Sequence, residues 1–382
     1  MRLLPILILI AFCTSCNKET STKKELKVRK FEFTEFQDLK PIKAIFLNEN
    51  LVMLGNETNS PNFGVYQFDI KGDFQNTIWK NQSDGSLGVD IIQDGNDLVI
   101  CAEVETDEGQ KQLEMFKISS EGIQLINKRF YSNSSEHLYK IIEKSNTEWL
   151  LVGYRADENT GVLGILLYVL DKENLTVKYE KYFPGIVLSV GADVKAKIGG
   201  DGFYLFGHSI EEEGGETDLF LYELSDSLDI VRVQDSFGGI EYEEASEILV
   251  DEEGFIYLLG HSASQDINHN VFVAKLDTSF GIIFEKQFGY DKHDGGESFA
   301  LSDDHTFSIV ARSNSTNHGD KSILYLEMDK QGNILENEFL GSDFDNRSDC
   351  IVHRSGVDYI FGYEWGEDGL AKPELYLIKK GD

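Results

Sequence analysis

A short run of apolar residues that ends in glycine or another small residue recurs seven times along the chain. The runs read LVMLG, DLVIC, WLLVG, FYLFG, IYLLG, FSIVA and DYIFG, and they end at Gly55, Cys101, Gly153, Gly207, Gly260, Ala311 and Gly362. Their spacing of about 50 residues is typical of repeat proteins, in which each repeat forms one structural unit. We call the last residue of each run the anchor of its repeat.

Three more strand-like segments follow each anchor. After Gly207 they read FLYELSD, IVRVQDSF and ASEILV. In the first of these, Phe220 and Tyr222 share one face of a strand, and Leu219 and Leu221 share the other. Strands that are apolar on both faces are typical of a sheet packed between two neighbours. Four such strands in each repeat of about 50 residues predict the blades of a β-propeller, whereas a β-sandwich array would not repeat one four-strand unit at one spacing.

The two ends of the chain fit the same frame. After Gly362 only one more strand remains, at residues 375–379, so the last blade lacks its outermost strand. The segment LKVRKFEF, residues 26–33, is a strand without a blade of its own. We therefore predict an all-β fold, a seven-bladed β-propeller of four-stranded blades forming a single domain over residues 25–382. Strand 26–33 joins the last blade and closes the ring, which leaves no open sheet edge.

The first residues of the chain have the pattern of an export signal. Arg2 precedes an apolar run from Leu3 to Phe12, which is too short to cross a bilayer as a helix. Small residues then precede Cys16, and this pattern resembles the lipobox of bacterial lipoproteins, although Cys13 stands where leucine is usual. The resemblance implies a signal peptide over residues 1–15, a lipid on Cys16 and a flexible tether over residues 16–24. The alternative is an ordinary signal peptide with an incidental cysteine.

The repeat itself also resembles a known family. Residues 207–250 read GHSIEEEGGETDLFLYELSDSLDIVRVQDSFGGIEYEEASEILV. This order of glycine, polar loop, strand, Asp turn, strand, Phe-Gly-Gly, acidic residue and strand is similar to the repeat of bacterial extracytoplasmic lipoproteins with β-propeller repeats. The resemblance extends over residues 26–382. It implies a propeller that is lipid-anchored in the cell envelope, at the outer membrane, where it is periplasmic or surface-exposed, and it implies little about chemistry.

Charge and cysteine content narrow the possible partners. The chain has 35 Lys and Arg against 67 Asp and Glu, a formal net charge of −32, which disfavours nucleic-acid binding. Cys101 and Cys350 fall in apolar strands of non-adjacent blades, so we expect buried free thiols rather than a disulfide. We expect a monomer that contacts the membrane through its lipid and has a possible protein or glycan ligand.

Candidate binding residues come from two sets that a propeller brings to one face. Innermost strands begin on the face where second strands end, and the long loops that follow the anchors lie on that face as well. We expect a binding funnel at this channel mouth, formed by Tyr154, His208, His261, Arg312, Tyr363, Trp365, Asp193, Glu244, Glu297 and Asp349. Because polar groups at strand ends often make turn hydrogen bonds, a structural role stays open for each of them.

The sequence contains no complete catalytic or cofactor motif. GHSIE and GHSAS lack the second glycine of a nucleophile elbow. Residues 342–349, SDFDNRSD, approach the spacing of a calcium loop but lack its central glycine and terminal glutamate. A metal site of His208, His261 and Glu244 is conceivable only if the fold brings them together. We predict no metal and no cofactor.

Two functions are compatible with these features. The favoured one is a non-catalytic binding or scaffold module for a protein, peptide or glycan. The alternative is a propeller-based lyase or hydrolase with its site in the channel mouth, in which His208, His261 or Arg312 serves as acid, base or anion clamp. The two differ in a spatial expectation, since catalysis requires the histidines and a carboxylate to meet in one pocket.

Overall fold

A computed structural model describes residues 28–81, 85–212, 215–237, 242–263, 268–302, 306–315, 321–341, 345–365 and 373–381. Within these ranges the chain forms 28 strands and no helix. None of the described segments is therefore a helix of the length and apolarity that crossing a membrane requires. The expected signal peptide, Cys16 and the tether lie outside the described residues.

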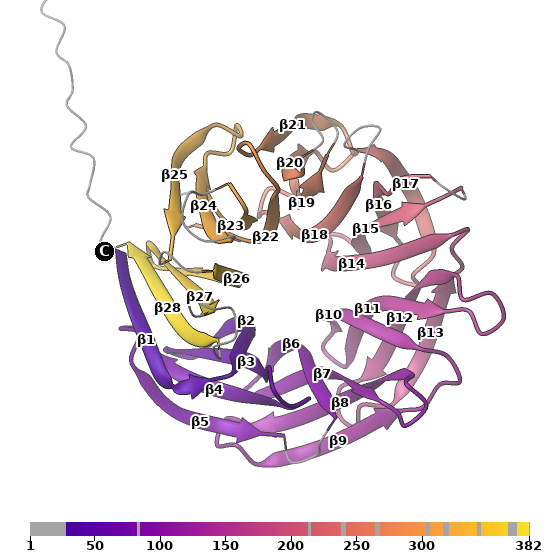
Figure 1. The fold of residues 1–382 in the computed structure, drawn as a ribbon. Helices are drawn as coiled ribbons and strands as arrows, with labels where there is room; N and C mark the ends of the chain where they lie inside the picture. The colour runs from indigo at the N-terminus through magenta and orange to yellow at the C-terminus, as the bar shows by residue number, and fades with distance from the viewer. Residues whose placement is uncertain are drawn as a thin grey trace, which may run out of the picture.

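The strands lie in groups of four around a central axis, and each group contributes one strand to each of four positions (Figure 1). The innermost strands are β2 (Leu39–Leu47), β6 (Ser86–Asp94), β10 (Glu136–Ser145), β14 (Leu188–Ala196), β18 (Glu243–Val250), β22 (Asp294–Leu301) and β26 (Asp345–Arg354). The second strands are β3 (Asn50–Glu57), β7 (Asp97–Glu105), β11 (Glu148–Ala156), β15 (Phe203–Ile210), β19 (Ile256–Ser262), β23 (Phe307–Ser313) and β27 (Val357–Trp365).

The remaining strands complete each group outward. The third strands are β4 (Phe63–Asp69), β8 (Lys111–Ser119), β12 (Leu163–Asp171), β16 (Asp218–Leu224), β20 (Asn270–Leu276), β24 (Ser322–Met328) and β28 (Glu374–Gly381). The outermost strands are β5 (Phe74–Lys80), β9 (Gln124–Phe130), β13 (Val177–Phe183), β17 (Ile230–Phe237), β21 (Ile282–Phe288), β25 (Ile334–Leu340) and β1 (Val28–Gln37). We number the groups as units 1 to 7 by their innermost strands, from β2 to β26.

Pairing within the units follows chain order. Five units are separate four-stranded antiparallel sheets, whereas units 3 and 4 are joined into one eight-stranded sheet by a parallel bridge between Leu163 and Leu188. In unit 7 the order is β1-β28-β27-β26, so the first described strand supplies the outermost position of the last unit, as the sequence predicts. This strand begins at Val28 and continues to Gln37, beyond the expected end at residue 33.

The core lies between neighbouring units rather than within one of them. One cluster packs Phe206 and Leu221 of unit 4 against Ile248 and Phe272 of unit 5. Six further clusters repeat this arrangement between successive units, and one of them packs β26–β28 of unit 7 on β2–β4 of unit 1. Burial on both faces explains why the second and third strands have apolar residues on both faces. Cys101 and Cys350 are both free and buried in this core, as predicted.

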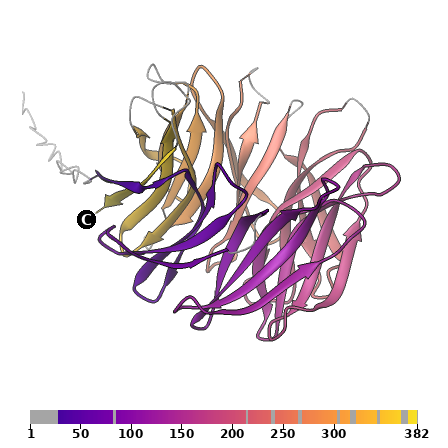
Figure 2. The same ribbon diagram turned by 60° about the horizontal axis from the view of Figure 1, so that its bottom comes forward.

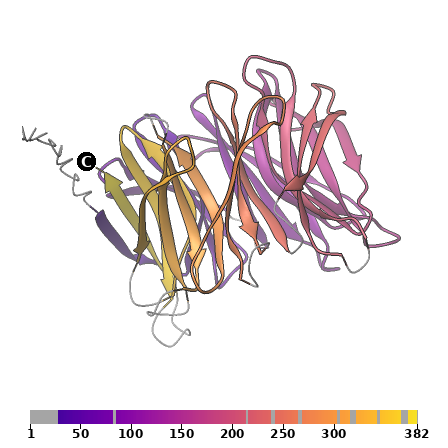
Figure 3. The same ribbon diagram turned by 90° about the horizontal axis from the view of Figure 1, so that it is seen from above.

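The strands run between the two faces of a disc (Figures 2 and 3). Innermost strands begin, and second strands end, on one face, which we call the mouth face.

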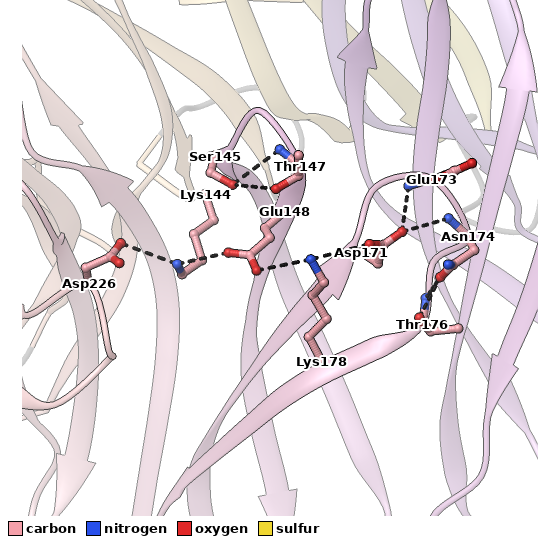
Figure 4. A network of polar contacts seen from close by, with 10 residues as sticks. All are labelled: Lys144, Ser145, Thr147, Glu148, Asp171, Glu173, Asn174, Thr176, Lys178 and Asp226. Atoms are coloured by element: carbon pink, nitrogen blue, oxygen red, sulfur yellow. Dashed lines mark hydrogen bonds and ion pairs between the residues drawn. The ribbon is translucent and has the colours of Figure 1, made fainter.

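On the opposite face of units 3 and 4, Lys144 Nζ contacts Glu148 Oε2 at 3.1 Å and Asp226 Oδ1 at 3.3 Å (Figure 4). Lys178 extends this chain of ion pairs from Glu148 to Asp171 (Figure 4). These pairs connect turns at the surface, where each contributes little to stability.

Candidate functional site in the central channel

Each innermost strand has a β-bulge at the same place. Its pairing with the second strand shifts register after Pro41, Gly88, Leu138, Gly191, Ala245, Gly296 and Ser348. The bulged residues form what we call the upper ring, which is nearer the mouth: Ile42, Val89, Tyr139, Ala192, Ser246, Glu297 and Asp349. The residues after them form the lower ring: Lys43, Asp90, Lys140, Asp193, Glu247, Ser298 and Cys350. Bulges re-aim side chains and are frequent beside active sites.

A cavity of about 350 Å³ lies at the level of these rings. All seven innermost strands contribute to its lining, which places it on the axis of the ring. Its volume is in the range of small-molecule pockets, about 300–1,000 Å³. The whole upper ring lines it, together with most of the lower ring and several residues at the mouth, which are Val190, His208, Glu244, Ala245, His261 and Arg312. The two histidines therefore share one pocket with carboxylates.

The acids of the lower ring tie adjacent units together. Asp90 Oδ2 accepts the Ile141 N–H at 3.0 Å, and Asp193 Oδ2 accepts the Ile248 N–H at 3.1 Å. In the same way Glu247 Oε2 accepts the Phe299 N–H at 3.1 Å. Each acceptor lies on one innermost strand and each donor on the next. These carboxylates therefore have a structural role.

Lysines neutralise the same carboxylates. Glu247 Oε1 lies 3.4 Å from Lys43 Nζ and 3.5 Å from Lys140 Nζ. Asp193 Oδ2 lies 3.6 Å from Lys195 Nζ and 3.9 Å from Lys140 Nζ. Burial alone would raise the pKa of Glu247, but Lys43, Lys140 and Lys195 outweigh it and hold that pKa well below its usual range. Lys43, Lys140, Asp193 and Glu247 of the lower ring are therefore each paired with an opposite charge.

Glu297 of the upper ring has the opposite environment. Its carboxylate faces Arg312, whose Nε lies 3.6 Å from Oε1, and its side chain is 23% exposed. Burial, reinforced by the charges of Asp349 and Glu244, raises the pKa of Glu297 to about 7 although Arg312 and Lys40 oppose the shift. Glu297 is therefore present in both protonation states near neutral pH. Arg312 is 44% exposed and can reach a ligand in the cavity.

The two histidines connect adjacent units by hydrogen bonds. His208 Nδ1 accepts the Ala245 N–H at 3.3 Å, and His261 Nε2 donates to the Gly296 carbonyl at 3.1 Å. Burial lowers the pKa of both, to about 4 for His261, so both rings are neutral at pH 7. A side chain at Gly295 would collide with the His261 ring, since a Cβ there would lie 2.6 Å from Cε1. Both histidines therefore make hydrogen bonds of the kind that the structural alternative predicts.

The other candidate residues lie at several levels of the channel. Tyr154, Tyr363 and Trp365 follow anchors as expected but do not line the cavity, and Tyr363 is buried. Asp193 is almost fully buried in the lower ring, although the sequence predicts it at the channel mouth with Glu297 and Asp349. The physical reason is position along the strand: Asp193 follows the bulge of β14, whereas Glu297 and Asp349 are themselves the bulged residues of β22 and β26.

Metal coordination is not built into the described part of the site. Within it, no three His, Cys, Asp or Glu side chains gather closely enough to hold an ion. Glu244 receives the Tyr242 hydroxyl at 3.1 Å, and Asp349 pairs with Lys40 Nζ at 2.7 Å. The calcium-like segment 342–349 is described only from residue 345 onward.

Several cavity residues were not expected from the sequence. Tyr139 in the upper ring, and Lys43, Lys140 and Glu247 in the lower ring, all line the cavity. Each lies in the middle of an innermost strand, and the sequence alone does not tell at which height along the channel such a residue lies. Their signal is the position relative to the bulge, which becomes visible only when the strands are paired.

Comparisons with known proteins identify the fold. No protein-family model matches the chain, and no curated protein matches its sequence. The periplasmic gluconolactonase of Pseudomonas aeruginosa matches with a TM-score of 0.56 at 12% identity, over 87% of this chain and 99% of its own. The β-propeller domain of the Trilobed protease from Pyrococcus furiosus matches with a TM-score of 0.51 at 10% identity, over 89% of this chain and 96% of its own.

Peptidases also share the fold over part of their length. A puromycin-hydrolysing peptidase of Mycobacterium tuberculosis matches with a TM-score of 0.55 at 11% identity, over 88% of this chain. The match covers 50% of that peptidase, so this chain spans about half of its length. At such identities the likeness establishes the fold alone. The chain is an all-β protein of the β-propeller class.

Proposed function

We propose that the chain is a seven-bladed β-propeller, closed by β1, that hydrolyses a small ester in the mouth of its channel. The seven units would be the blades. Support for closure comes from the pairing of β1 with β28, whose register runs from Val28 opposite Lys380 to Gln37 opposite Glu374. Further support comes from the apolar cluster that joins unit 7 to unit 1.

One observation carries the proposal for hydrolysis: Glu297 has a pKa of about 7 inside a cavity that also contains Arg312. A general acid or base is most effective when its pKa is close to the working pH. A cation beside it can stabilise negative charge that develops on a carbonyl oxygen. Such tuning is typical of functional sites.

The chemistry follows from these two side chains. Ionised Glu297 takes a proton from a water molecule while the water oxygen attacks the ester carbonyl carbon. The carbonyl oxygen becomes negative and faces the Arg312 guanidinium. When the bond to the alkoxide breaks, protonated Glu297 returns the proton to the leaving oxygen, which yields a carboxylic acid and an alcohol. Hydrolysis of a cyclic ester gives both groups in one hydroxy acid.

The gluconolactonase supports the choice of an ester. The fold shared with this enzyme accounts for almost all of its length, whereas it accounts for half of the puromycin-hydrolysing peptidase. The sequence favoured a non-catalytic module for a protein, peptide or glycan. Such a module explains a polar channel but gives no reason for a carboxyl group whose pKa is about 7. His208 and His261 would then position the blades rather than act as acid or base.

Hydrolysis can be tested directly with the purified chain and D-glucono-1,5-lactone, with proton release as the readout. We expect Glu297→Gln to lower kcat by at least about 100-fold, the usual scale for losing a general acid–base group. Glu108→Gln is the matched control, because Glu108 lies in an exposed turn and does not line the cavity. If the wild type binds the lactone without turning it over, the non-catalytic function is correct instead.

We also propose that Cys16 carries the lipid and that the mouth opens away from the membrane. Val28 lies at the face opposite the mouth, because it pairs with Lys380 near the end of β28. A chain attached through the residues before Val28 would therefore present the mouth to the aqueous side. In vesicle-bound protein, a bulky maleimide should label Glu108→Cys on the mouth face faster than Glu121→Cys on the opposite face. Equal or reversed rates would refute this orientation.

A further inference from the structure

The upper ring is divided into two unlike halves. Its members from units 1 to 4 are hydrocarbon or aromatic, and its members from units 5 to 7 are polar: Ile42, Val89, Tyr139 and Ala192 against Ser246, Glu297 and Asp349. The innermost strands β10 and β22, which hold Tyr139 and Glu297, lie on opposite sides of the ring (Figure 1). A molecule in the cavity therefore has an apolar wall on one side and the proposed reactive groups on the other.

Tyr139 dominates the apolar half. Its side chain is 42% exposed and lines the cavity, while its ring centroid lies 5.9 Å from that of Tyr154. Tyr154 in turn stacks on His137, with centroids 4.5 Å apart and planes 21° apart. The three rings pack in a row, and Tyr139 is the one that faces the cavity.

Polar contacts fix this surface in place. Glu103 Oε1 lies 3.1 Å from His137 Nδ1 and also accepts the Leu138 N–H at 3.0 Å. Burial opposes ionisation of Glu103, but His137 and Lys111 outweigh it and lower its pKa, so it stays charged at pH 7. An exposed aromatic ring that is held rigidly inside a cavity loses little entropy when a ligand stacks on it.

We infer that Tyr139 is the stacking surface for a ring in the substrate, and that the substrate is a lactone. This inference rests on the proposed hydrolysis and defines its substrate class. One face of the lactone ring, with its C–H groups, would pack on Tyr139. The carbonyl edge and the hydroxyl groups would then face Arg312, Glu297 and Ser246 across the cavity. A linear ester has no such face and gains nothing from Tyr139.

The test compares Tyr139→Ala and Tyr139→Phe on a cyclic and a linear substrate, D-glucono-1,5-lactone and ethyl glycolate. We expect Tyr139→Ala to raise KM for the lactone about tenfold, the scale of one lost aromatic contact, with kcat changed less than about threefold. Tyr139→Phe keeps the ring and should raise KM for the lactone much less than Tyr139→Ala does, and Tyr139→Ala should raise KM for the lactone more than KM for ethyl glycolate. Tyr179→Ala is the control, since Tyr179 is 44% exposed on the outermost strand β13 of the same unit.

Binding of the non-hydrolysable D-glucono-1,5-lactam, measured by calorimetry, separates the two proposals. If the wild type binds the lactam and Tyr139→Ala does not, but no ester is hydrolysed, the stacking surface stands and the hydrolase proposal fails. If the wild type hydrolyses the lactone and Tyr139→Ala leaves KM unchanged, the stacking surface is refuted while hydrolysis stands. If the wild type neither binds the lactam nor hydrolyses the lactone, both are wrong.

Discussion

Glu247 and Glu297 are the same kind of residue in one cavity, yet their surroundings drive their pKa values in opposite directions. Glu247 belongs to the lower ring, accepts hydrogen bonds from Ser298 and Phe299, and is paired with Lys43 and Lys140. Glu297 belongs to the upper ring, where its nearest cation is Arg312 at 3.6 Å. The acids of the lower ring make ion pairs and hydrogen bonds that join adjacent units, whereas the upper ring contains an acid with a raised pKa.

The bulge produces this difference. Glu297 is the bulged residue, and the two residues after it supply the donors that Glu247 accepts. A bulge frees one residue from the regular ladder and turns it toward the axis. Two carboxylates with opposite pKa shifts in one site are a common sign of separate roles. Here one role is structural and the other is the proposed acid–base function.

Removing the charge of Glu247 should have the largest effect. Glu247→Gln leaves Lys43 and Lys140 without their shared partner, so we expect the free energy of unfolding to fall by about 3 kcal/mol, in the range for a broken buried ion pair. Urea unfolding of this variant against Glu108→Gln measures it. A loss below about 0.5 kcal/mol, the usual scale of surface substitutions, would mean that the lower ring does not hold the blades together.

Glu297→Gln should change stability in the opposite direction and in a pH-dependent way. The folded state holds the Glu297 proton up to a pKa of about 7, from the ordinary value of 4.5 in the unfolded chain. Between these values the folded state binds more protons, so wild-type stability falls as pH rises. We expect the variant to gain about 3 kcal/mol relative to wild type between pH 4.5 and pH 8. A difference that does not vary with pH would contradict the raised pKa.

The neighbours of Glu297 should shift its pKa in opposite directions. Asp349 raises this pKa and Arg312 lowers it. Asp349→Asn should therefore move the acidic limb of the pH–rate profile to lower pH, and Arg312→Gln should move it to higher pH with a lower maximum rate. Shifts in the same direction would show that the limb reports another group.

The histidines should have the smallest effects. His261→Leu removes one hydrogen bond to the Gly296 carbonyl, so we expect a loss of about 1 kcal/mol in unfolding free energy. Because the ring is already neutral at pH 7, kcat/KM should fall less than about tenfold, compared with about 100-fold for Glu297→Gln. Steady-state kinetics of the two variants compare them. An equal loss in both would make His261 an acid–base residue after all.

The sequence predicts the fold well because blade strands are apolar on both faces and recur with their anchors. The prediction that the segment 26–33 pairs with the last strand of the chain is confirmed, since β1 pairs with β28. The site is predicted less completely. His208, His261, Glu244, Glu297 and Arg312 do meet in one cavity, but their roles depend on register, which a bulge changes by one residue.

Tyr139 and Glu247 are two residues whose position in the channel is known only from the strand register. In the sequence Tyr139 is one more aromatic residue in a strand, and Glu247 is one more acid in an acidic chain. Only the paired strands place Tyr139 at the level of Glu297 and Glu247 one level below. The pKa of Glu297 likewise depends on Asp349 and Lys40, which are far from it in sequence.

A measurement of the pKa of Glu297 is the most direct test of its proposed acid–base role. This pKa can be measured by NMR titration of protein labelled with ¹³C at the glutamate carboxyl carbons, with Glu297→Gln identifying the signal. We predict a midpoint at about 7 for Glu297, with Glu247 still ionised at the lowest pH that the fold tolerates. A Glu297 midpoint at about 4.3, the value of an unperturbed glutamate, would contradict this role.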